Sequence, residues 1–401
     1  MKCQSLFYRF CFCIALLFSI SSFISCETDE SDVPDSSKSY NQTVLMYMPW
    51  AGGGIYTYFL KNIASFETAI KNNHGLDGNA LIVFISENEN KSNLIKITYN
   101  NGECRRDTIQ TFDFDECNYT TSTGISSIIS DVVSIAPAKT YALAIGCHGM
   151  GWLPAGTNIS TRMRSAMLKQ ENIFQTRYFG HSSDIEYRTD ITTLAEGIKR
   201  SGVKMEYIMF DDCYMSNIET AYNLKDVTNY LIASTCEIMI EGMPYAEIGI
   251  DLLKNNYKGI CDGFYSFYSN YMMPCGTIGI TDCREVERMA AVMKDINTVY
   301  PNGIENVEDI QDLDGYTQTI FFDFGDYVSN LCQEDGYLLS IFNEQLKSLV
   351  PYKANTDTYY SMLNNRQTLI KTFSGLTISD PTENSDVIGE QTKTSWYRAT
   401  H

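Results

Sequence analysis

The chain has 401 residues, of which 44% are hydrophobic, 12% aromatic and 20% charged, with 26 Gly and only 9 Pro. This composition excludes collagen, a coiled coil and wholesale disorder, which would need a dominant repeat or far fewer aromatic side chains. The 49 acidic residues outnumber the 30 basic ones and give a formal net charge of −19. Because an acidic surface repels phosphate groups, we expect no nucleic-acid partner and a preference for cationic ones.

The N-terminus is typical of an export signal. Two basic residues precede the apolar run 11–24, which is too short to span a bilayer comfortably and fits the apolar part of a secretory signal. The run leads into Ser25-Cys26, which resembles a bacterial lipoprotein signal in which Cys26 becomes the lipidated first residue. An ordinary signal peptide cut near Ser25 is the alternative. We expect residues 1–26 to be the signal, and a lipid on Cys26 to anchor the protein to the outer membrane or cell surface.

Residues 27–42 are acidic, rich in serine and nearly devoid of apolar groups, a composition typical of a tether.

Three of the 13 cysteines leave with the signal and Cys26 would be acylated, which leaves nine. An odd number of cysteines outside the cytoplasm implies at least one free thiol. Cys104 and Cys117 are candidates for a bridge across a hairpin. No CxxC pair or Cys/His cluster has the spacing of zinc ligands, so we predict no metal site.

Short apolar runs rich in β-branched and aromatic residues alternate along the chain with longer segments of helical spacing. Such nearly continuous apolar runs are typical of a parallel sheet that is covered on both faces. The alternation predicts an α/β fold, in which functional groups lie at the carboxyl ends of the strands. The predicted strands are 43–48, 80–85, 140–145, 207–210 and 230–234. The predicted helices between them are 55–72, 123–134, 189–200 and 215–224.

The C-terminal third differs from this pattern because it is mostly helical. The predicted elements are helices 284–300, 318–332 and 336–349 and a late strand within 372–378. We expect residues 43–285 to form the main domain and residues 286–401 a smaller subdomain that packs on its sheet.

Residues 153–188 are a long polar stretch without a clear period, and a loop of that length in a compact domain is usually functional or cleavable.

Two strand ends carry the residues most suited to catalysis. His148 follows strand 140–145 in a glycine-rich turn, and Cys213 follows strand 207–210 just before a predicted helix. The positive end of that helix would favour a thiolate. If the two strands are neighbours, the imidazole and the thiol lie at one edge of the sheet. Taken singly, a histidine beside glycines is often a structural turn residue, and a buried cysteine is usually inert. No GxSxG, Walker A, HExxH or GxGxxG sequence competes with this pair.

Three blocks of the sequence resemble the clostripain-like cysteine peptidases, which have a caspase-like fold. They are AIGCHGMGW (144–152), YIMFDDCYMSNIE (207–219) and STCEIMIEGMPY (234–245). The resemblance covers roughly residues 43–285 and implies a mostly parallel sheet with helices on both faces. The chain departs from the family after its first strand, where residues 49–52 (PWAG) replace a frequent Asp-Asn pair.

The resemblance also implies roles for individual residues. Cys213 would attack the scissile carbonyl and His148 would protonate the leaving amine, while the backbone N–H groups of Gly149 and Cys213 would form the oxyanion hole. Family members cleave after Arg or Lys.

A basic side chain of the substrate needs a carboxylate in its pocket, because an uncompensated buried charge is costly. Asp211 matches the family position for this role and is preferred to Asp212; both have a helix-capping role as the alternative. Glu241 is a second candidate acid, with Glu237 as its competitor.

Family members are often made as zymogens that are cut at a basic residue between the two blocks. We therefore expect self-cleavage within residues 153–188, near Arg162, Arg164 and Lys169. The alternative is a solvated basic loop that balances an acidic protein.

The sequence thus predicts an exported cysteine endopeptidase, monomeric and without an organic cofactor, that cleaves protein or peptide substrates after Arg or Lys. Its membrane contact would be the lipid anchor alone. Calcium activates some relatives, but the chain has no DxDxDG-type loop, so calcium dependence stays open. The rival function is a non-catalytic surface lipoprotein, a binding or adhesion module that keeps the same scaffold.

Overall fold

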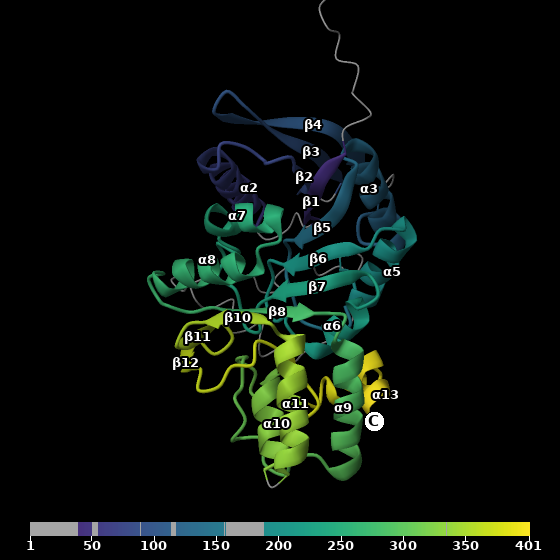
Figure 1. Cartoon of the computed structure of the whole chain (residues 1–401), viewed down its shortest axis with the longest axis vertical. Coiled ribbons are helices and arrows are strands. Elements are labelled where there is room, and N and C mark those ends of the chain that lie inside the picture. The colour runs from purple at the N-terminus through teal and green to yellow at the C-terminus, as the bar shows by residue number, and fades with distance from the viewer. Residues whose placement is uncertain are drawn as a thin grey trace, which may run out of the picture. The chain divides into compact units, whose positions relative to one another are not determined.

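A mixed sheet of nine strands forms the centre of the protein (Figure 1). The computed structural model describes residues 39–49, 55–88, 90–113, 118–155, 157, 188–333 and 335–401, and Ser39–His401 form one compact unit. The strands of the sheet are β1 (Tyr40–Met48), β2 (Ala80–Asn88), β3 (Lys91–Asn100), β4 (Glu103–Asp113), β5 (Ala138–Ile145), β6 (Met205–Phe210), β7 (Thr228–Ala233), β8 (Thr277–Asp282) and β10 (Tyr352–Asn355). Their order across the sheet is β10-β8-β7-β6-β5-β1-β2-β3-β4.

The five central strands β1, β2, β5, β6 and β7 are parallel, and antiparallel strands extend the sheet at both edges. Consecutive residues of β1 face opposite sides: Val44 and Met46 belong to one apolar core, and Leu45 and Tyr47 to the other. All four are buried, which is why the strand is apolar without interruption. The predicted α/β sheet covered on both faces is confirmed.

Helices cover each face of this sheet (Figure 1). On one face lie α2 (Ile55–Asn72), α7 (Tyr245–Lys254) and α8 (Tyr257–Ser269). On the other lie α3 (Ser122–Ile135), α5 (Ile191–Ser201) and α6 (Ile218–Leu224). No helix in the described part of the chain is long and apolar enough to cross a membrane.

The C-terminal part combines helices with loops and short strands, so it is less helical than the sequence predicts, and its strand β10 joins the large sheet beside β8. Its other elements are α9 (Val286–Val299), β9 (Phe322–Asp323), α10 (Phe324–Leu331), α11 (Gly336–Leu349), β11 (Thr358–Ser361), β12 (Arg366–Leu369), β13 (Thr377–Ile378), α12 (Ile388–Gln391) and α13 (Ser395–Thr400). Gly279 of β8 packs so closely on this part that a Cβ there would lie 1.8 Å from the carbonyl oxygen of Gly375. The C-terminal part therefore rests directly on the backbone of the sheet.

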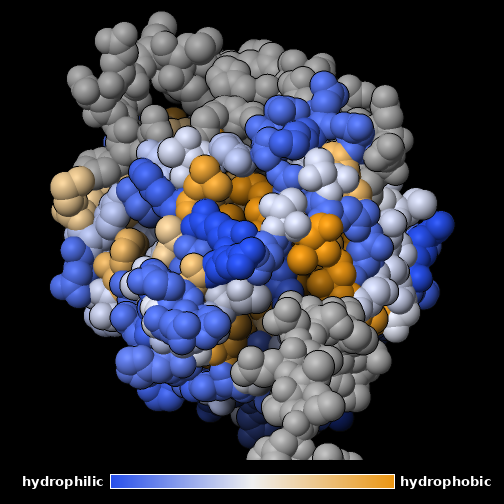
Figure 2. Space-filling model, turned by 90° about the horizontal axis from the view of Figure 1, so that it is seen from above, coloured by the Kyte–Doolittle hydropathy of each residue, from blue (hydrophilic) through white to orange (hydrophobic). Residues whose placement is uncertain are grey.

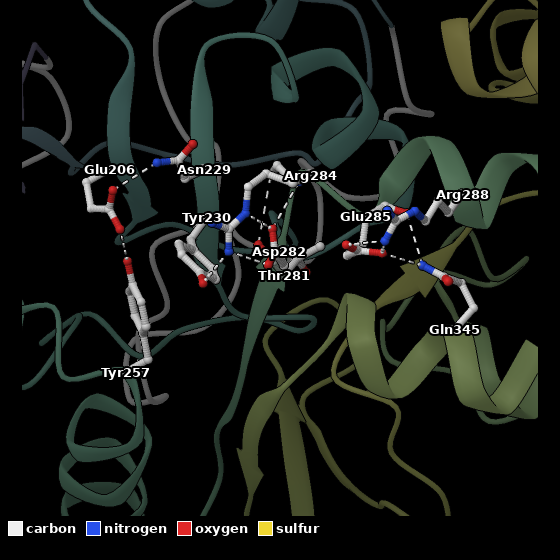
Figure 3. A network of polar contacts seen from close by, with 11 residues as sticks. Glu206, Asn229, Tyr230, Tyr257, Thr281, Asp282, Arg284, Glu285, Arg288 and Gln345 are labelled. Carbon is white, nitrogen blue, oxygen red and sulfur yellow. Dashed lines mark hydrogen bonds and ion pairs between the residues drawn. The ribbon is translucent and has the colours of Figure 1, made fainter.

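A polar network joins the sheet to the surrounding helices near the amino ends of β6 and β7 (Figure 3). The Glu206 carboxylate accepts hydrogen bonds from Asn229 Nδ2 at 2.9 Å and from the Tyr257 hydroxyl at 3.0 Å. Arg284 contacts Asp282 with Nε at 2.7 Å and Nη2 at 2.6 Å. Arg284 Nη2 also donates to the hydroxyl of Tyr230 on β7 at 2.5 Å. Together these bonds join β6, β7, the end of β8 and the start of α8 at the edge opposite to the carboxyl ends of the parallel strands.

The surface visible in Figure 2 is mostly hydrophilic, with separate apolar patches between the polar residues. Large hydrophobic side chains that are well exposed lie far apart in the chain, for example Ile109 on β4, Met272 after α8 and Tyr337 on α11. Some exposed apolar residues are normal for a folded protein.

Several element boundaries differ from those predicted from the sequence. β1 begins at Tyr40, inside the predicted tether, because Tyr40 and Gln42 pair with β5. The hairpin of β3 and β4, the strand β8 and the helices α7 and α8 were not predicted. The predicted helix 318–332 is wrong in its first half, which contains a loop and β9. The predicted signal 1–26, with its lipidated Cys26, lies outside the described residues, as does Cys117.

Candidate active site

The turns that follow β5 and β6 are in contact at the carboxyl edge of the sheet. The last residues of the two strands, Ile145 and Phe210, are register partners, and the N–H of Asp211 donates to the carbonyl of Ile145 at 2.7 Å. A Cβ on Gly149 would lie only 2.3 Å from the carbonyl oxygen of Cys213. The structure therefore brings the glycine that follows His148 against the backbone of Cys213, at the shared edge that the sequence predicts.

The thiol of Cys213 is fully buried. The backbone N–H of Ile238 donates to its Sγ at 3.3 Å. Burial, followed by the negative charge of Glu237, raises the pKa of the Cys213 thiol well above its ordinary value. The predicted thiolate at a helix N-terminus is wrong, because α6 begins only at Ile218 and a loop separates it from Cys213. The thiol is therefore neutral here and needs a base to become a nucleophile.

The residue after Cys213 has an unusual backbone conformation. Tyr214 has φ of 60°, in the left-handed region that non-glycine residues seldom adopt and that stores strain. Its buried ring stacks on Phe321 at 5.2 Å, and Asn217 Nδ2 donates to its carbonyl at 2.7 Å. Surrounding contacts thus hold a sharp turn at the candidate nucleophile.

Glu237 connects this turn to the C-terminal part of the chain. Its Oε1 accepts hydrogen bonds from the Tyr214 hydroxyl at 2.8 Å, from Ser361 Oγ at 2.5 Å and from the N–H of Met362 at 3.0 Å. The side chain is buried, and its hydrogen bonds lie within the protein. These contacts give Glu237 a structural role in joining the nucleophile turn to the C-terminal part.

The two preferred pocket acids, Asp211 and Glu241, adjoin the same segment, which leads into α7. Asp211 is fully buried, and its carboxylate accepts from the N–H of Met243 at 2.6 Å and the hydroxyl of Tyr245 at 3.1 Å. Glu241 is half-buried and accepts from the Tyr271 hydroxyl at 2.8 Å. Neither Asp211 nor Asp212 caps α6, because Asn217 has that role, so the helix-capping alternative is wrong.

A buried acid on α6 connects this helix to the turn after β5. Glu219 is fully buried, and its Oε1 accepts from the N–H of Ser379 at 2.8 Å. Ser379 Oγ in turn accepts from Trp152 Nε1 at 2.8 Å. Glu219 Oε2 has no hydrogen-bond partner among the described residues. Burial, followed by the nearby charge of Asp380, raises the pKa of Glu219 to about 8. Glu219 is therefore mostly protonated at neutral pH.

The hydrogen-bond partners of these supporting residues could not be predicted from the sequence, because they are far away in the chain; Glu237 and Ser361, for example, are 124 positions apart. The candidate processing residues Arg162, Arg164 and Lys169 lie outside the described residues. Within the described ranges, no group of three or more His, Cys, Asp or Glu side chains could hold a metal ion.

A mixed sheet with a parallel centre and helices on both faces, and with histidine and cysteine turns in contact at its carboxyl edge, defines a cysteine peptidase of the caspase-like class. The model of the clostripain family matches residues 47–377, and the chain belongs to this family of cysteine proteases.

Solved structures of relatives agree with this assignment. The chain is 47% identical to "iotapain", a secreted C11 cysteine protease of Bacteroides thetaiotaomicron, with a TM-score of 0.79 over 90% of this chain and 99% of that one. It is 56% identical to a clostripain of Bacteroides thetaiotaomicron solved with the peptide inhibitor BTN-VLTK-AOMK, with a TM-score of 0.52 over 56% of this chain and 99% of that one. An inactive zymogen C11 protease of Parabacteroides distasonis, 24% identical, shares the fold, with a TM-score of 0.74 over 90% of this chain and 99% of that one. No curated protein matches the chain.

Because Glu219 is buried and its pKa is raised, we predict that the stability of the folded protein depends on pH through this residue. Between pH 4.5 and about 8 the unfolded chain has Glu219 ionised while the folded protein keeps it protonated. Stability therefore falls as pH rises through this window. In Glu219→Gln the free energy of unfolding should fall less steeply with pH. Relative to the wild type, it should therefore rise by a few kcal/mol between pH 4.5 and about 8. Urea unfolding at several pH values measures this.

The exposed Glu344 provides the matched control, and Glu344→Gln should follow the wild type at every pH. If the curve of Glu219→Gln also runs parallel to that of the wild type, Glu219 is not protonated in the folded protein.

Proposed function

We propose that this cysteine protease is an exported, lipid-anchored endopeptidase that cleaves peptide bonds after Arg or Lys, with Cys213 as nucleophile and His148 as acid and base. The observation that carries the proposal is the close approach of Gly149 to the backbone of Cys213, where a Cβ added to Gly149 would lie 2.3 Å from the carbonyl oxygen of Cys213. This proximity supports the proposal that the imidazole of His148 and the thiol of Cys213 act on the same scissile bond.

The neutral, buried thiol determines the order of proton transfers in this proposal. His148 accepts the thiol proton as Sγ attacks the scissile carbonyl, and the N–H groups of Gly149 and Cys213 stabilise the oxyanion. The imidazolium then donates its proton to the leaving amine, which forms the thioester. A water molecule, deprotonated by His148, hydrolyses the thioester and restores both side chains.

Two carboxylates support a preference for cationic substrates. Asp211 and Glu241 adjoin the segment that follows β7, and Asp211 is fully buried. An Arg or Lys side chain would neutralise this negative charge, whereas an acidic side chain would be repelled. The inhibitor bound by the 56% identical relative ends its peptide in lysine, which supports the same preference.

The complete burial of Cys213 supports a form that must be activated before it binds substrate. A more distant relative is an inactive zymogen. In this proposal the protein cleaves itself within residues 153–188, near Arg162, Arg164 or Lys169, and Cys26 carries the lipid anchor.

Peptides with a fluorogenic leaving group test the specificity and the nucleophile together. Arg and Lys substrates should be cleaved and the matching Asp substrate should not, and Cys213→Ala should lose at least ~10³-fold in kcat/KM because no nucleophile remains. Cys104→Ala, which removes a half-buried thiol on β4, should retain the wild-type rate.

Two outcomes would reject this assignment. Turnover that survives in Cys213→Ala would place the nucleophile elsewhere. No turnover after treatment with trypsin, which cuts at basic residues, would favour the non-catalytic surface lipoprotein.

Self-cleavage has its own test. Intact mass spectrometry of the purified wild type after incubation should show two fragments whose new ends lie within residues 153–188, and Cys213→Ala should stay intact. Fragments from both proteins, or from neither, would reject processing by the protein's own active site.

A further inference from the structure

The carboxylate of Asp212 bridges the two catalytic turns. Its Oδ1 accepts a hydrogen bond from the backbone N–H of Cys147 at 2.6 Å. The thiol of Cys147 lies within donating distance of two acceptors, Asp212 Oδ2 at 3.4 Å and the carbonyl oxygen of His148 at 3.3 Å. Asp212 is 1% exposed, so water has little access to its carboxylate. A charged acceptor in such a site makes stronger hydrogen bonds than a neutral one.

This bond continues the pairing of β5 and β6 beyond the end of the strands. The backbone ladder ends where Asp211 N–H donates to the carbonyl of Ile145 at 2.7 Å. Past that point the carboxylate of Asp212 takes the position that a backbone carbonyl has in a regular ladder, and accepts from Cys147. The pairing is thereby extended by one bond while both chains leave the sheet.

The two candidate catalytic residues are the next residues along each chain. His148 directly follows Cys147, and Cys213 directly follows Asp212. Packing reinforces the bond, because a Cβ on Gly149 would lie 2.8 Å from the Cβ of Asp212. The carboxylate therefore has little room to move, and any displacement of it shifts one catalytic turn relative to the other.

We propose that Asp212 is a positioning residue, whose carboxylate fixes the imidazole turn relative to the nucleophile turn. This role rests on the proposed function of His148 and Cys213. In this role Asp212 acts through the position of its acceptor Oδ1, which holds the backbone N–H of Cys147 next to His148. Geometry is decisive here, because a misplacement of about 1 Å can cost ~10²-fold in rate.

Two variants separate the position of the acceptor from its charge. Asp212→Asn keeps an acceptor at the same place without the charge, and its kcat should stay within about threefold of the wild type. Asp212→Glu keeps the charge but moves the acceptor by one methylene, and its kcat should fall about 10²-fold. KM for an Arg substrate should change little in either variant, because the carboxylates at Asp211 and Glu241 are untouched.

The kcat values are expressed per active site titrated with a covalent peptide inhibitor, so that misfolded molecules do not count, and thermal unfolding is measured beside them. If Asp212→Glu does not fold, Asp212→Ala replaces it with the same expected loss. The role is overturned if Asp212→Asn loses as much as Asp212→Glu, or if Asp212→Glu keeps the wild-type kcat. The positioning role is also overturned if the variants lose kcat in proportion to their fall in unfolding temperature and their KM rises by the same factor.

Controls distinguish this proposal from the proposed function. Asp226, whose side chain is 79% exposed, is the matched acid, and Asp226→Asn should leave kcat unchanged. If Cys213→Ala still turns over substrate, the proposed nucleophile is wrong. If Cys213→Ala is inactive while Asp212→Glu keeps the wild-type kcat, only the positioning role is wrong.

Discussion

The parallel pairing of β5 with β6 is the interaction on which the rest of the site depends. Neighbouring strands are about 4.8 Å apart, so two residues that follow paired strand ends start close together. Both strands are buried at this end, where Ile145 and Phe210 are 4% and 3% exposed. Both faces of these strands are buried, so a slip of one residue would exchange side chains of different size between the two cores, for example Ala144 and Ile145, and close packing therefore fixes the register. The same packing places His148 and Cys213 at one edge.

The C-terminal part helps to build the nucleophile turn. The N–H of Thr377 donates to the carbonyl of Ser216 at 2.9 Å, and Glu237 joins Tyr214 to Ser361 and Met362. The strained backbone of Tyr214 persists because such contacts hold it. The family match extends to residue 377, so it includes these segments. Although it is distant in sequence, the C-terminal part supports the turn that carries Cys213.

The sequence predicted the central strands well because their signal is local. A strand such as 80–85 (ALIVFI) is apolar throughout, since both of its faces are buried. The β3–β4 hairpin had a local signal that was missed: Asn101-Gly102 is a typical hairpin turn, and both residues have positive φ. The start of α6 was also within reach, because Asn217 is a strong N-cap residue.

Other features of the site have no local signal. The burial of Cys213 depends on a cluster that includes Trp152, Phe321 and Val387, which are brought together only by the fold. The prediction of a thiolate from the helix dipole was wrong for the same reason. The sequence did not show that a loop separates Cys213 from α6, or that the thiol is fully buried. Hydrogen bonds such as that between Glu237 and Ser361 depend on tertiary structure and not on sequence spacing.

The most direct test of the account is the site at which a reactive substrate analogue attaches. The activated protein is treated with a peptidyl chloromethyl ketone that ends in Arg, and the adduct is located by peptide mass mapping. The account predicts one adduct per molecule, on Cys213, that forms much more slowly in His148→Ala. An adduct on another cysteine, or full loss of activity without any adduct on Cys213, would contradict it.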